Sequence, residues 1–154
     1  MKSQRWSGHD TRVRHSLQLL AAALAVAFTV SCGSGADECI SLPETCSPTL
    51  STDYNTIYSN VFSTSCGTGA GVMTCHGSAG NQGGLSLADP NGAYSALLNG
   101  APHARVVPGD PACSPLMARL TAGDPNVRMP KNGAPLGEGV LCAISSWIRE
   151  GASR

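Results

Sequence analysis

The chain of 154 residues carries ten basic and ten acidic side chains, so its formal net charge is zero. Its length favours one domain, and once four basic residues near the N-terminus are assigned to an export signal, no basic patch remains of the kind that nucleic-acid-binding proteins present. No Ser-His-Asp set, HExxH helix, phosphate-binding loop or paired-carboxylate arrangement occurs. We therefore expect a protein that is not an enzyme and has neither a nucleic-acid partner nor a small-molecule substrate.

An export signal is predicted over residues 1–31. Basic residues precede an uncharged, largely apolar run of 14 residues, Leu17 to Val30. That length suits a secretory signal and falls short of the ~20 residues that span a bilayer as a helix. Loss of this segment removes four of the ten basic and one of the ten acidic residues, which leaves a formal charge of −3.

The apolar run ends in a sequence that resembles a bacterial lipobox, Thr29-Val30-Ser31-Cys32-Gly33. The resemblance implies that Cys32 is lipidated and that acyl chains anchor the protein at the periplasmic face of a bacterial membrane. The alternative is ordinary cleavage nearby, with Cys32 free. Residues 32–52 are rich in Gly, Ser, Thr and Pro and are predicted to form a flexible tether. The folded domain is predicted to span residues 53–154.

Amphipathic helices are predicted at the start and the end of this domain. Asp53 is a candidate N-cap for the first, and Gly151 is a natural stop for the last. The apolar stripes recur at helical spacing and consist of Tyr54, Ile57, Tyr58, Val61 and Phe62 in the first helix and Val140, Leu141, Ile144, Trp147 and Ile148 in the last.

Two shorter helices are predicted between them. One spans Asn91 to Asn99 and stops at Gly100, and the other spans Ser114 to Leu120 with Ser114 as the cap and Pro115 at the first helical position. The other segments are Gly- and Pro-rich, and no alternating stretch is long enough to predict a sheet. The sequence thus predicts an all-α domain of three to four short helices with long loops. Its core is modest, so a large apolar cofactor or disulfides would add to it.

An adjacent cysteine and histidine, Cys75 and His76, form the end of a haem-attachment motif. In C-x-x-C-H the thiols bond the haem vinyl groups and the imidazole ligates the iron. Here eight residues, Gly67 to Thr74, separate Cys66 from Cys75. Three glycines in this insert allow it to loop outward and return. Two thioethers, one thioether from Cys75 alone, and a Cys66–Cys75 disulfide without haem all remain open.

Further short phrases occur in a fixed order around that motif. They are Ile57-Tyr58, Val61-Phe62, Cys75-His76-Gly77, Gly83-Gly84-Leu85-Ser86-Leu87, Arg105-Val106-Val107-Pro108-Gly109-Asp110-Pro111, Arg128-Met129-Pro130 and Trp147-Ile148. Through them, roughly residues 54–151 resemble the small class I-like cytochromes c, and more closely the single-domain cytochrome c-like bacterial lipoproteins.

The resemblance implies one haem c, with Cys66 and Cys75 in its attachment and with His76 and Met129 as the two axial ligands of the iron. A thioether sulfur opposite an imidazole raises the reduction potential. The implied function is that of a lipid-anchored electron carrier with redox partner proteins still to be identified. The alternative is a haem-free, disulfide-stapled envelope lipoprotein with a binding or structural role on the same helical scaffold.

Other side chains have weaker claims to the haem. Met73 lies too near His76 in the sequence to reach the opposite axial position, and Met117 is expected in the core. His103 is an alternative distal ligand, ranked below Met129. Arg105 or Arg128 could pair with a haem propionate or remain a solvated surface charge.

The remaining cysteines form an even set. Cys39, Cys46, Cys113 and Cys142 permit three pairings, and an exported protein favours their oxidation. We favour Cys39–Cys46 within the tether and Cys113–Cys142 within the domain, where the second bridge would join two helices.

Overall fold

The structure is a computed structural model that describes residues 39–67 and 75–154. All of the described residues belong to one compact unit. The predicted export signal and lipobox, with Cys32, and the insert residue Met73 lie outside the described residues.

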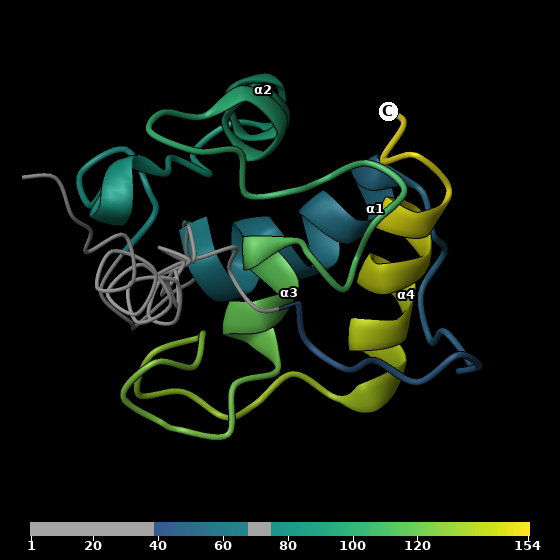
Figure 1. The fold of residues 1–154 in the computed structure, drawn as a ribbon. Helices are drawn as coiled ribbons and strands as arrows, with labels where there is room; N and C mark the ends of the chain where they lie inside the picture. The colour runs from purple at the N-terminus through teal and green to yellow at the C-terminus, as the bar shows by residue number, and fades with distance from the viewer. Residues whose placement is uncertain (1–38, 68–74) are drawn as a thin grey trace, which may run out of the picture. The chain divides into compact units, whose positions relative to one another are not determined.

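The described residues are helical and contain no strand, which confirms the predicted all-α class. Short helices alternate with long loops (Figure 1). In chain order the elements are α1 (Tyr54–Ile57), the π-helix η1 (Tyr58–Gly67), the 3₁₀ turn η2 (Gln82–Gly84), α2 (Pro90–Asn99), α3 (Pro115–Leu120) and α4 (Glu138–Arg149).

The first predicted helix is formed by α1 and η1 together. The Asp53 carboxylate accepts a hydrogen bond from the Thr56 backbone N–H at 2.9 Å, as expected of an N-cap. All five residues of the predicted apolar stripe are buried. The π-helix η1, which begins within that stripe, extends beyond it to Gly67 and includes Cys66 as its penultimate residue.

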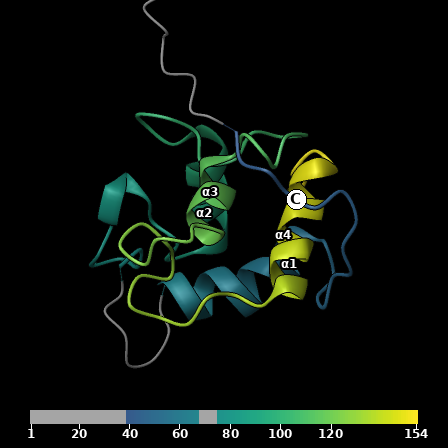
Figure 2. The ribbon, with the colours of Figure 1, turned by 60° about the horizontal axis from the view of Figure 1, so that its bottom comes forward.

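Aromatic side chains join the first helix to the last. The centroid of the Tyr54 ring lies 5.7 Å from that of Trp147 and 5.0 Å from that of Tyr94 on α2. The ring centroids of Phe62 and Trp147 are 6.4 Å apart. Contacts at these distances add to the burial of large apolar surfaces. In both views α4 lies beside α1, and it also packs against α3 (Figures 1 and 2).

The ends of α4 and α2 match the sequence prediction. Gly151, at φ 98°, follows α4 and donates its N–H to the Ile148 carbonyl at 3.0 Å, which ends the helix as predicted. Helix α2 ends before Gly100, also as predicted, and begins one residue early at Pro90. Its N-cap is Asp89, whose carboxylate accepts from two backbone N–H groups of the first turn.

The start of α3 differs in its detail. Ser114 stands at the N-cap position, but its side chain makes no cap hydrogen bond. Its buried hydroxyl donates to the Asp110 carbonyl at 2.8 Å and accepts from the Val107 N–H at 2.9 Å. The side chain therefore fixes the preceding loop instead of the helix terminus.

The favoured disulfide pairing was wrong. The bridges are Cys39–Cys113 and Cys46–Cys142, with sequence separations of 74 and 96 residues. Cys113 also lies in the turn before α3 and not on a helix. The physical reason is that the N-terminal segment folds back along the domain. Ile40 donates its N–H to the Ala112 carbonyl at 3.0 Å, and Thr49 donates to the Gly139 carbonyl at 3.1 Å, so each bridge is accompanied by a backbone contact.

Residues 39–52 are consequently fixed to the domain, although the sequence predicts them as part of the flexible tether. Two covalent bridges and two backbone hydrogen bonds hold them against the segments before α3 and at the start of α4. Among the described residues, no helix has the length and apolar character needed to cross a membrane.

Candidate haem-binding site

The His76 ring is oriented by the backbone. Its Nδ1 lies 3.1 Å from the Leu85 carbonyl oxygen. Because a carbonyl only accepts hydrogen bonds, Nδ1 must carry the proton, and the lone pair of the neutral ring then resides on Nε2. Histidines that ligate metals are held in this way, with one nitrogen hydrogen-bonded and the other free to coordinate.

The His76 main chain is held by the same loop. The Leu87 N–H donates to the His76 carbonyl at 2.5 Å, and the Gln82 N–H donates to the Cys75 carbonyl at 2.8 Å. The turn between these contacts uses Gly83 and Gly84 at φ 64° and 71°, a conformation that glycine adopts without strain. The residues from η2 to Leu87 therefore position both the backbone and the imidazole of His76.

Cys66 lies next to the adjacent residues Cys75 and His76. The His76 N–H donates to the Cys66 carbonyl at 3.2 Å, although His76 follows Cys66 by ten positions in the sequence. The half-buried Cys66 side chain packs against the core, and both Cys66 and Cys75 are free thiols. Burial, and then the neighbouring Cys75, raise the pKa of the Cys66 thiol to about 11, so it is protonated at neutral pH.

Gly67 is the last residue of η1, and here the backbone of η1 closely approaches the backbone of Leu87. A Cβ atom at this position would lie 2.7 Å from the Leu87 carbonyl oxygen, closer than real Cβ contacts allow. The glycine thus lets the end of η1 pack directly on the segment that holds His76. Leu87 is fixed further by the Tyr58 hydroxyl, which donates to its carbonyl at 3.2 Å.

Met129 lies in the loop between α3 and α4. Its half-buried side chain packs against the core, and its N–H donates to the carbonyl of Arg119 on α3 at 2.9 Å. Next to it, the Arg128 Nε is buried and has no hydrogen-bond partner among the described residues. A buried donor without an acceptor is unfavourable, so this guanidinium is suited to an anionic group that the polypeptide does not supply.

The side chains with weaker claims to the haem differ in their burial and in their contacts. Met117 is fully buried in α3 and belongs to the core, as expected. His103 is exposed in a loop. Arg105 donates to the carbonyls of Gly83 at 2.7 Å and Ala101 at 3.4 Å, and also to that of His103, so its guanidinium joins two loops.

These features fit a covalently attached haem. Two free thiols precede a histidine whose Nε2 is left to coordinate, a thioether follows in the loop after α3, and the buried Arg128 Nε has no hydrogen-bond partner among the described residues. In the part of the chain that the structure describes, no three or more His, Cys, Asp or Glu side chains gather as they would around a metal ion. Haem iron takes its axial ligands one from each face and needs no such cluster.

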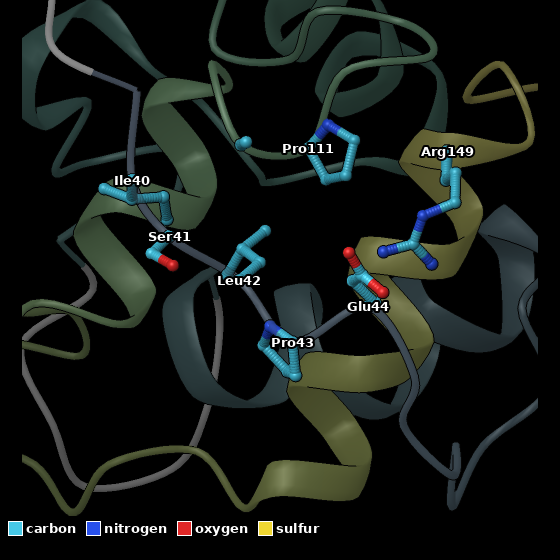
Figure 3. Close-up of a pocket in the computed structure, with 8 residues that line it drawn as sticks. Ile40, Ser41, Leu42, Pro43, Glu44, Pro111 and Arg149 are labelled. Atoms are coloured by element: carbon cyan, nitrogen blue, oxygen red, sulfur yellow. The ribbon is translucent and has the colours of Figure 1, made fainter.

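A separate shallow groove of ≈ 490 Å³ lies where the N-terminal segment meets the end of α4 (Figure 3). The side chains of Glu44 and Arg149 point toward each other at its edge. The groove contains none of the cysteine, histidine or methionine side chains considered above. Its lining is formed by Ile40, Ser41, Leu42, Pro43, Glu44, Pro111, Ala112 and Arg149.

Comparison with known proteins identifies the same region. Residues 73–133 match the family model described as Planctomycete cytochrome C. The match supports a cytochrome c-like domain. It contains Cys75, His76 and Met129, whereas Cys66 lies before its start. No curated protein and no solved structure gives a significant match.

Two contributors to the site have no predicted role in the sequence. Leu85 and Leu87 belong to a phrase that carries the resemblance, but their function is to hold His76 through backbone groups. A backbone acceptor has no side-chain signature, so residue types alone could not identify it. The approach of Cys66 to His76 is likewise a property of the fold.

Proposed function

We propose that this protein is a one-electron carrier with a single c-type haem. In this assignment Cys75 would attach the haem, and His76 and Met129 would ligate its iron. The observation that carries the proposal is the His76 ring, in which the Leu85 carbonyl engages Nδ1 and leaves Nε2 to coordinate. The match over residues 73–133, which include all three side chains, supports it.

The haem supplies the redox-active iron, and imidazole with thioether ligation favours its ferrous state. The polypeptide would orient and shield it. The Leu85 carbonyl fixes the imidazole and increases its basicity, and the Arg128 guanidinium can neutralise a propionate. With two protein side chains as axial ligands, no coordination position remains for a substrate, so electron transfer is proposed and catalysis is not.

Haem content tests this function directly. The protein should be purified from a host with cytochrome c maturation, denatured, and examined by pyridine haemochrome spectroscopy and intact mass. We expect a haemochrome spectrum and a mass increase of one haem. A colourless protein without that increase would contradict the proposal and favour the haem-free, disulfide-stapled lipoprotein.

A matched pair of variants tests Met129 as the distal ligand. Met129→Leu should abolish the charge-transfer band of a thioether–iron bond, because leucine keeps the volume and removes the sulfur. Met117→Leu makes the same change at a buried core position and should leave the band intact. Loss of the band in the Met117 variant, or its survival in the Met129 variant, would show that a residue other than Met129 is the distal ligand.

We also propose that Cys32 carries the lipid that holds this carrier at the periplasmic face of a membrane, where redox partner proteins exchange electrons with it. The support is the lipobox-like sequence Thr29-Val30-Ser31-Cys32-Gly33 after an apolar run. The protein should incorporate radiolabelled palmitate and fractionate with membranes. Cys32→Ala should abolish both the labelling and the membrane association. Labelling that persists in the variant would refute this anchor.

A further inference from the structure

One hydrogen bond rejoins the two halves of the interrupted cysteine–histidine sequence. The His76 N–H donates to the Cys66 carbonyl at 3.2 Å. In C-x-x-C-H the histidine follows the first cysteine by four residues, and four residues is the spacing of an α-helical N–H···O=C bond. Here His76 makes the same contact with Cys66 from ten residues away.

The position of Cys66 explains why this contact forms. Cys66 is the penultimate residue of η1, and the last carbonyls of a helix have no partner within it. The His76 N–H provides that partner, as the next turn of an uninterrupted helix would. The helical hydrogen-bond pattern that is interrupted after Cys66 is therefore continued by the segment that begins at Cys75.

A second set of contacts keeps the halves together. Leu87 donates its N–H to the His76 carbonyl at 2.5 Å, and its own carbonyl is the group that a Cβ on Gly67 would strike. The residue after Cys75 is thus hydrogen-bonded to Leu87, and the residue after Cys66 lies closely against the Leu87 carbonyl. The approach of the halves depends on backbone contacts on both sides of the insert.

We propose that Cys66 and Cys75-His76 act as one split haem-attachment motif, in which Cys66 takes the place of the first cysteine and both thiols bind the haem. Each S–H adds across one vinyl C=C: sulfur bonds to the carbon next to the ring, and the hydrogen goes to the terminal carbon. The addition releases nothing and needs no oxidant. This inference rests on the haem function proposed above and goes further by assigning two thioethers.

The sequence contains a cleavage site that tests this on the native protein. Met73 lies between the two cysteines, and cyanogen bromide cleaves after methionine. The haem protein is first reduced and alkylated, which opens the disulfides and leaves thioethers intact. After cleavage, we expect the fragment ending at Met73 to stay joined to fragment 74–117, with a mass equal to both plus one haem.

The contrary result is equally distinct. If haem is found on fragment 74–117 alone and Cys66 is alkylated, the split motif is refuted while the haem function stands. If the native protein contains no covalent haem, the proposed function fails and the split motif fails with it. The two failures are therefore distinguishable in one experiment.

Variants provide an independent readout. Cys66→Ala should shift the pyridine haemochrome band to longer wavelength, because one vinyl group stays conjugated with the ring, and an unshifted band would overturn the proposal. Deletion of residues 68–73 leaves Cys66-Gly67-Thr74-Cys75-His76, an uninterrupted motif. That variant should keep the wild-type band position, and a shifted band would show that the insert is needed for the second thioether.

Discussion

Arg105 and Arg128 show how contacts separate two residues that the sequence offers equally to a haem propionate. The Arg105 guanidinium already donates to backbone carbonyls on two loops. The Arg128 Nε is buried without a partner among the described residues. Since a buried unpaired donor is unfavourable, the structure singles out Arg128 as the residue that would gain most from an anionic group of the cofactor.

Replacement of Arg128 should therefore change the redox potential. Arg128→Gln removes a positive charge beside the proposed haem, which favours the ferric state and should lower the midpoint potential by an amount on the order of tens of millivolts. Arg119→Gln removes a charge from an exposed position on α3 and should have a smaller effect. Spectroelectrochemical titration of both variants measures the difference. Equal shifts would show that Arg128 acts only as part of the net charge.

Asp53 makes acid stability depend on a helix cap. Hydrogen bonds, first from the Thr56 backbone N–H and then from the Ser51 side chain, lower the pKa of its carboxyl from 3.8 to about 2. A lowered pKa stabilises the fold fully above pH 3.8, and this contribution is lost as the pH falls through 2. Asp53→Asn keeps an acceptor and does not titrate, so its stability should fall less steeply between pH 4 and 2. Thermal unfolding across that range measures the slopes, and parallel slopes would contradict the prediction.

At the scale of elements, the sequence predicts the helices well and their connections poorly. The stripe from Tyr54 to Phe62 and the glycine after α4 are local signals, because helical spacing and a left-handed cap involve neighbours in the chain. The role of Ser114 and the contact between Cys66 and His76 depend on segments brought together from a distance. The sequence thus identified candidate site residues, and the fold was needed to see how their backbones meet.

The close approach of η1 to the Leu87 segment predicts a sensitive glycine. Gly67→Ala would place a Cβ 2.7 Å from the Leu87 carbonyl oxygen, so backbone must shift where Cys66 and His76 are held together. We expect a loss of about 1–3 kcal/mol in the free energy of unfolding, measured by urea denaturation.

Gly123→Ala is the matched control for that change. Gly123 has open space around its Cβ position, so the same added methyl meets no atom within 4 Å. The control should retain wild-type stability to within ~0.5 kcal/mol. A Gly67 variant as stable as this control would mean that η1 and the Leu87 segment can separate without loss.

For the molecule as a whole, the two disulfides determine which distant segments stay together. Cys39–Cys113 and Cys46–Cys142 join the N-terminal segment to the turn before α3 and to α4. Sequence reasoning favoured a short local bridge because it treated residues 39–52 as a tether. Long-range pairing is set by the path of the chain, and no local pattern records it.

The pairing predicts which thiol a single substitution releases. Cys46→Ala should free Cys142, so maleimide labelling of the unfolded, unreduced variant should modify Cys142 and leave Cys39 unlabelled. The lost bridge closes a segment of 96 residues, and bridges of this kind contribute about 2–4 kcal/mol, mainly by restricting the unfolded chain. Cys46→Ala/Cys142→Ala should lose a similar amount, because the single variant has already lost the link. A label on Cys39 would restore the local pairing, and residues 39–52 would then lack the covalent connection to α4 that holds them on the domain.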